Sequence, residues 1–114
     1  MGRKLSAEER MRLLCEKSLP FAAKMLDGAG PAPWKDFITL GIPENDRVKG
    51  LLEVGITRDR WYLLAGVLPE GSDRLASQYL RQGTKEEIRA YMEGSAAPRE
   101  LETALRELIR EAER

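Results

Sequence analysis

The side chains that enzymes use most often for proton transfer and metal binding are scarce in this chain. It has no histidine and a single cysteine among its 114 residues. Histidine is the commonest general base and metal ligand, and one thiol without histidine cannot complete a zinc site of the usual Cys/His kind. One cysteine also cannot form an intramolecular disulfide, so the fold does not depend on an oxidising compartment. We therefore expect no metal, no cofactor and a cytoplasmic protein.

Paired carboxylates are the remaining candidates for acid–base chemistry. Glu8-Glu9 and Glu86-Glu87 both stand in the first turns of expected helices, where acidic side chains complement the helix dipole. The other scattered acids lack the spacing of a calcium-binding loop; they are Asp27, Asp36, Glu44 and Asp46. Cys15 falls on an apolar helix face, where a thiol behaves as an inert hydrophobe. Since no serine elbow and no phosphate-binding glycine loop is present either, we predict that the chain is not an enzyme.

Length and charge limit the remaining classes of protein. The 114 residues fit one domain, and 19 basic side chains balance 19 acidic ones. A net charge of zero argues against a uniformly basic surface for nucleic acid. The longest apolar run, Trp61–Leu68, is far shorter than the roughly 20 residues needed to cross a bilayer. We expect a single domain over residues 1–114 with no membrane association.

The N-terminal third contains the clearest helix signal. Ser6 and Glu9 form a capping box, which predicts a helix starting at Ala7. Its apolar positions recur at helical spacing as far as Leu26. Pro20 interrupts this run and either kinks one helix or separates two. Residues 27–33, rich in glycine and proline, are the best candidate for a linker.

The middle of the chain carries mixed signals, which we interpret as short helices. Residues 34–41 place aromatic and aliphatic side chains at helical spacing before a glycine, and residues 43–55 repeat that arrangement after a proline. The segment at about 57–68 is apolar on every side. It could be a buried strand, but its leucine, alanine and glycine content favours a buried central helix ending at Pro69.

Three more helices are expected in the C-terminal third. Residues 72–83 and 84–94 each begin with a hydroxyl cap and end with glycine, and Thr84 with Glu87 repeats the capping box. The last helix, about 98–113, carries leucines at heptad spacing, which fits core packing or homodimerisation. The expected fold is therefore all-α: a compact single-domain bundle of six or seven mostly short helices around the central helix.

The function that fits this chain best is stoichiometric binding to another protein, as a regulator, inhibitor or adaptor. Tyr62 and Tyr79 are expected to be exposed, and tyrosine and arginine dominate interface hot spots. The alternative is a DNA-binding regulator resembling a helix-turn-helix protein, because basic residues gather between positions 74 and 89. Those candidate contacts, for either partner, are Arg74, Arg81, Lys85 and Arg89. Alignment of all four on one basic face would favour DNA, whereas a mixed face beside an apolar patch would favour a protein.

Overall fold

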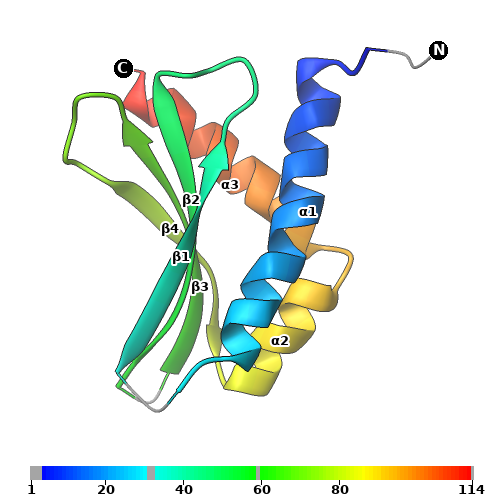
Figure 1. Cartoon of the computed structure of the whole chain (residues 1–114), viewed down its shortest axis with the longest axis vertical. Coiled ribbons are helices and arrows are strands. Elements are labelled where there is room, and N and C mark those ends of the chain that lie inside the picture. The colour runs from blue at the N-terminus through cyan, green and yellow to red at the C-terminus, as the bar shows by residue number, and fades with distance from the viewer. Residues whose placement is uncertain (1–3, 31–32, 59, 114) are drawn as a thin grey trace.

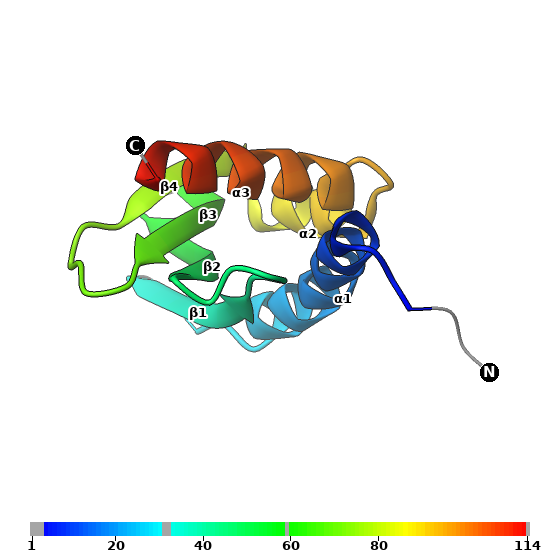
Figure 2. The ribbon, with the colours of Figure 1, turned by 90° about the horizontal axis from the view of Figure 1, so that it is seen from above.

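The computed structural model has three helices and a four-stranded antiparallel sheet (Figure 1). It describes residues 4–30, 33–58 and 60–113. In chain order the elements are α1 (Ala7–Asp27), β1 (Trp34–Gly41), β2 (Val48–Thr57), β3 (Arg60–Pro69), β4 (Ala76–Gly83), α2 (Lys85–Glu93) and α3 (Ala97–Ala112). Seen from above, the three helices gather on one side of the sheet (Figure 2). The prediction of an all-α bundle of six or seven helices is therefore wrong.

The first helix forms as its capping residues predict. The Glu9 N–H donates to Ser6 Oγ at 3.1 Å, and the Ser6 N–H donates to Glu9 Oε1 at 3.2 Å. The helix then runs through Pro20 without separating into two. Its buried stripe comprises Met11, Cys15, Ser18, Leu19, Ala22 and Leu26. Gly28 ends the helix, and residues 31–32 of the expected linker lie outside the described residues.

Four of the segments expected to be helical are strands. Residues 34–41 form β1, and most of the segments 43–55, 57–68 and 72–83 form β2, β3 and β4. Each strand pairs with the next along the chain, so the sheet order is β1-β2-β3-β4. The reason is clearest in β2, where alternate positions face the helices while Lys49 and Glu53 do not. The apolar period there is two rather than 3.6.

The expected central helix at about 57–68 is instead the central strand β3. Leu63, Ala65 and Val67 are fully buried towards the helices, and Tyr62 and Leu64 are also buried on the other face. A strand whose side chains are buried on both faces, here on the open side by their neighbours within the sheet, is apolar throughout and cannot be distinguished from a buried helix by periodicity. Leucine, alanine and glycine are accommodated because β3 is paired along both edges, and strand preference depends strongly on such surroundings.

The last two expected helices are confirmed as α2 and α3. The Glu87 N–H donates to Thr84 Oγ1 at 3.1 Å, which caps α2. In α3, Leu101, Leu105 and Leu108 are buried against the rest of the chain. The heptad leucines considered for homodimerisation thus belong to the core and are not exposed to a second copy. Among the described residues, no helix is both long and apolar enough to cross a membrane.

Among the described residues, the helices expected just before residue 84 for a helix-turn-helix arrangement are likewise absent. Most of the segment 57–68 is β3, and the segment 72–83 is a loop followed by β4. Any binding of DNA would therefore have to use a different arrangement.

Candidate functional site

One face of the sheet is covered by the helices and the other is not, and we call the uncovered one the open face (Figure 2). Side chains alternate between the two faces along each strand. The burial pattern and the register assign to the open face Phe37 and Thr39 of β1, Leu51 and Glu53 of β2, Tyr62 and Leu64 of β3, and Tyr79 of β4. Leu75, just before β4, lies beside them over Gly66. This face is mostly apolar although no helix or strand of the described residues packs on it.

Tyr62 is held at the centre of the open face by its neighbours on β2. Its hydroxyl donates to Glu53 Oε2 at 2.8 Å, and its side chain is only 7% exposed. Burial and the adjacent Glu53 carboxylate both raise the pKa of the Tyr62 phenol above its ordinary value. The ring lies across Gly55, where a Cβ atom would stand 2.5 Å from the tyrosine Oη. Only glycine at this position leaves room for the ring.

A second glycine supports the other half of the open face. The side chains of Leu51 and Leu75 lie over Gly66, whose Cβ would stand 3.2 and 3.1 Å from their Cδ atoms. Tyr79 packs edge-on against Tyr62, with ring centroids 5.6 Å apart and an interplanar angle of 87°. Aromatic pairs prefer this geometry, so the two rings form a fixed unit.

Several side chains of the open face are exposed to solvent. Phe37 is 53%, Leu75 46% and Tyr79 54% exposed. In the part of the chain that the structure describes, only five large apolar side chains are exposed, and these three share one face. Gathered exposed apolar groups of this kind mark interaction surfaces, whereas scattered ones need no explanation.

The charges around this apolar centre are mainly positive. Lys35 and Lys49 are exposed on the open face by strand alternation. Glu53 is the acidic side chain on this face among the described strand residues, and it accepts the hydrogen bond from Tyr62. The arrangement can therefore accept an apolar group surrounded by acids.

The six residues proposed from the sequence divide into two sets. Tyr62 and Tyr79 are together on the open face, but Tyr62 is buried where exposure was expected. The four basic residues lie elsewhere. Arg74 is in the loop before β4, where its N–H donates to Ser72 Oγ at 3.0 Å.

The other three basic side chains are engaged within the chain. The guanidinium of Arg81 lies 5.8 Å from the centre of the Tyr91 ring, and the ammonium of Lys85 lies 5.3 Å from that of Trp61. Arg89 pairs with Asp27 and Glu93, and its hydrogen bond to Glu93 raises its pKa. Arg89 is thus neutralised by two carboxylates, whereas Arg81 and Lys85 keep their charges over aromatic rings and Arg74 lies in a separate loop.

Sequence reasoning missed the open-face residues Phe37, Leu51, Leu64 and Leu75. Their signal was weak because each stands next to an apolar residue that faces the core, as Phe37 does beside Ile38. The alternation in β2 would have revealed the sheet, and with it the two faces. The hydroxyl caps and the helix stripes gave no information about these positions.

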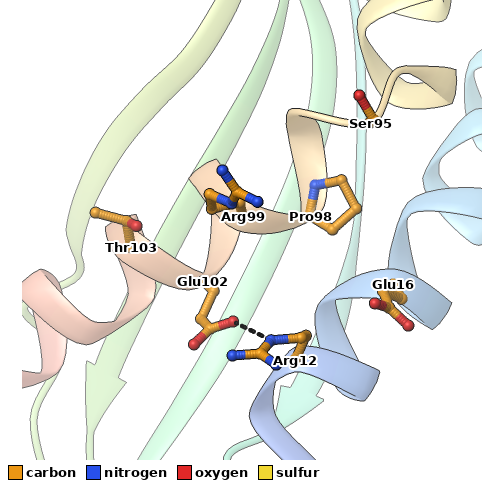
Figure 3. A pocket seen from close by; sticks show the side chains of 7 residues that line it. All are labelled: Arg12, Glu16, Ser95, Pro98, Arg99, Glu102 and Thr103. Atoms are coloured by element: carbon orange, nitrogen blue, oxygen red, sulfur yellow. Dashed lines mark ion pairs between the residues drawn. The ribbon is translucent and has the colours of Figure 1, made fainter. Parts of the chain in front are cut away.

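A cavity of about 530 Å³ between α1 and α3 brings charged and small polar side chains together with Pro98 (Figure 3). The Glu102 carboxylate in it lies 3.7 Å from Arg12 Nε and 3.0 Å from Arg106 Nε, so its charge is balanced. Nearby Cys15 is fully buried, and desolvation raises the pKa of its thiol to about 12, which keeps it protonated. Over the described residues, no three His, Cys, Asp or Glu side chains are grouped to hold a metal ion.

The chain thus belongs to the class of proteins in which helices cover one face of an antiparallel sheet and leave the other open. No protein-family model matches it, and no match is found among curated proteins or solved structures. The functional argument therefore depends on the chain's own surfaces.

Proposed function

We propose that this chain is a non-enzymatic binding protein that docks another protein on its open face and acts as a stoichiometric regulator, inhibitor or adaptor. The observation that carries the proposal is the group of exposed Phe37, Leu75 and Tyr79 around the buried Tyr62 and Leu64. A rigid aromatic unit with exposed apolar neighbours has the composition of an interface centre. Lys35 and Lys49 favour a partner whose contact surface is apolar at its centre and acidic at its edge.

The non-enzymatic and cytoplasmic parts of the proposal are supported by residue chemistry. The chain lacks histidine, and its single thiol is buried with a raised pKa. Because the one cysteine is free and cannot form a disulfide within the chain, the fold does not need an oxidising compartment, which is consistent with a cytoplasmic location. The predicted DNA-binding function has no comparable surface in its support, because its four basic residues are dispersed or engaged.

A comparative capture experiment tests the proposal. The wild-type chain, an open-face variant carrying Leu75→Ser and Tyr79→Ser, and a control carrying Leu5→Ser are immobilised and exposed to lysate of the source cells. Leu5 is a matched control because it is an exposed apolar side chain (38%) that precedes α1 and is not part of the open face. We expect a protein that the wild type and the control retain and the open-face variant loses. Its purified form should bind the open-face variant at least about tenfold more weakly, as loss of interface anchors requires.

Two results would overturn the proposal. One is that no retained protein depends on Leu75 and Tyr79. The other is binding of duplex DNA that falls steeply with added salt, which would show that phosphate contacts dominate.

A further inference from the structure

Strand β1 has one edge that pairs with nothing in the described part of the chain. It lies at the end of the sheet and forms its ladder with β2 alone. The Phe37 N–H donates to Asp36 Oδ1 at 2.9 Å, so it points away from β2. Backbone groups alternate in direction along a strand, and the N–H and C=O of Thr39 therefore also point outwards. This edge presents a row of backbone donors and acceptors to solvent.

Strand β1 carries only part of the usual protection of a sheet edge. Lys35 and Asp36 are charged, and the Asp36 carboxylate accepts the outward Phe37 N–H. The strand contains no proline, and its register with β2 is unbroken over all eight residues. The opposite edge strand, β4, is different because a register irregularity occurs opposite Leu63 and Leu64. Irregular edges resist pairing with another strand, whereas regular ones favour it.

A groove runs between this free edge and α1. It has a volume of about 320 Å³, and its lining is predominantly apolar. The lining residues are Leu14, Lys17, Ser18 and Phe21 of α1 and Ile38, Thr39 and Leu40 of β1. Phe21 is 61% exposed at this groove, the largest value among the large apolar side chains described. A strand added to β1 would place alternate side chains in the groove and the intervening ones beside Phe37 on the open face.

The charges at the groove are positive. Lys17 lines it, and the ammonium of Lys24 lies 5.9 Å from the centre of the Phe21 ring. The nearby acids of α1 are directed elsewhere: Glu16 lines the cavity towards α3, and Asp27 pairs with Arg89. On β1, the Asp36 carboxylate accepts the Phe37 N–H. Lys17 and Lys24 have no ion-pair partner among the residues that the structure describes.

We propose that the β1 edge and this groove form a strand-addition site for an extended, acidic segment of a partner protein with apolar residues at alternate positions. Main-chain hydrogen bonds to Lys35 and Thr39 would provide affinity, with Phe37 joining them when the Asp36 carboxylate releases its N–H, and the groove would select the side chains. A second copy of the chain fits less well, because pairing two β1 edges would bring the lysines of two positive grooves together. The inference rests on the proposed function for the nature of the partner, but it uses the backbone of β1 and the groove at α1 and not the side chains of Leu75 and Tyr79.

Titration with designed peptides tests the site directly. The probe is a short capped peptide of alternating valine and glutamate, compared with a peptide in which lysine replaces glutamate. We expect the acidic peptide to bind, to lose affinity with added salt, and to protect the Thr39 amide from hydrogen exchange. The lysine peptide should bind at least about tenfold more weakly, since with its valines in the groove it places like charges beside Lys35 on the open face.

Variants separate backbone pairing from side-chain contact. Thr39→Pro removes an outward N–H and leaves the ladder with β2 intact, whereas Thr39→Val keeps the N–H and changes only the side chain. We expect the proline variant to weaken binding at least about tenfold and the valine variant to leave it unchanged. If Thr39→Pro fails to fold, Lys35→Glu on the exposed surface of β1 provides the second variant, and it should reduce the preference for the acidic peptide.

The outcomes also distinguish this inference from the proposed function. The variant carrying Leu75→Ser and Tyr79→Ser should still bind the acidic peptide, even if it loses its cellular partner. The strand-addition site is refuted if the acidic peptide does not bind, if Thr39→Pro binds it like the wild type, or if protection appears at β4 instead of β1. Dimerisation of the chain through β1 in the absence of peptide would also overturn the choice of occupant.

Discussion

The glycines of the sheet allow a graded test of how the open face is built. Replacing Gly55, Gly66 and Gly41 by alanine adds the same methyl group at three positions with different surroundings. At Gly55 the new Cβ would meet Tyr62 Oη at 2.5 Å and Trp34 backbone oxygen at 2.9 Å. At Gly66 its nearest neighbours are flexible leucine ends at 3.1 and 3.2 Å, and at Gly41 nothing lies within 4 Å.

These distances give the order of the expected effects. Gly55→Ala must displace the Tyr62 ring, which breaks the hydrogen bond to the Glu53 carboxylate, a loss of about 1.5–3 kcal/mol. Exposing part of the ring destabilises the fold by about 1 kcal/mol more. Alanine also lowers the conformational entropy of the unfolded chain, which stabilises the fold by about 0.4–1 kcal/mol. We expect a net destabilisation of about 2–3 kcal/mol. The free energy of unfolding of Gly66→Ala should lie within about 1 kcal/mol of that of the wild type, because the leucine side chains can shift.

Urea unfolding at neutral pH measures all three variants, with Gly41→Ala as the matched control. The free energy of unfolding of this control should equal that of the wild type or exceed it by up to about 1 kcal/mol. A double variant with Gly55→Ala and Tyr62→Ala supplies the second check. Since the ring is the obstacle, the two changes together should cost less than the sum of each alone. Equal stability of Gly55→Ala and Gly41→Ala, or strict additivity in the double variant, would refute this account of the open face.

Three further predictions concern the covered side of the sheet and the turns. The buried Cys15 thiol has a pKa of about 12 against an ordinary 9.0, so the stability it contributes is complete below pH 9 and declines as the pH rises towards 12. Between pH 8 and 10.5 the wild type should lose about 2 kcal/mol more than Cys15→Ala, measured by urea unfolding, and parallel pH profiles would contradict the burial of the thiol. Thr84→Ala should lower the free energy of unfolding by about 1 kcal/mol through loss of the α2 cap, whereas Thr84→Ser should restore it. Arg58 has a φ of 57° in the β2–β3 turn, so Arg58→Asn should raise stability by up to about 1 kcal/mol, and no gain in thermal denaturation would count against a strained turn.

The sequence predicted helices where their ends are encoded by single residues. Ser6 with Glu9 and Thr84 with Glu87 cap α1 and α2 through contacts three residues apart, and such contacts depend little on the rest of the chain. Strands have no comparable local signal, because their backbone partners lie in other strands. Residues 61–68 could not be assigned from periodicity once both faces were buried.

The candidate site was only partly predictable for the same reason. Tyr62 and Tyr79 were selected for their side-chain type, and their proximity follows from the β3–β4 register, which the sequence does not state. The four basic residues were grouped because they are near in sequence on assumed helices. In the sheet, Arg81 bends towards Tyr91 and Arg74 occupies a loop, so sequence proximity did not produce one surface.

The chain-order arrangement of the sheet also has a consequence for how the protein folds. Every strand pairs with its immediate neighbour in sequence, so β1 to β4 can form the sheet through successive hairpins whose contacts are near in sequence. The first helix is in the opposite situation, because part of its apolar stripe packs on α3 at the far end of the chain. During synthesis α1 therefore leaves the ribosome first and completes its packing last. Until then the stripe around Cys15 is exposed, and mutations that slow formation of α3 should increase aggregation and thiol reactivity in the nascent chain more than in the finished protein.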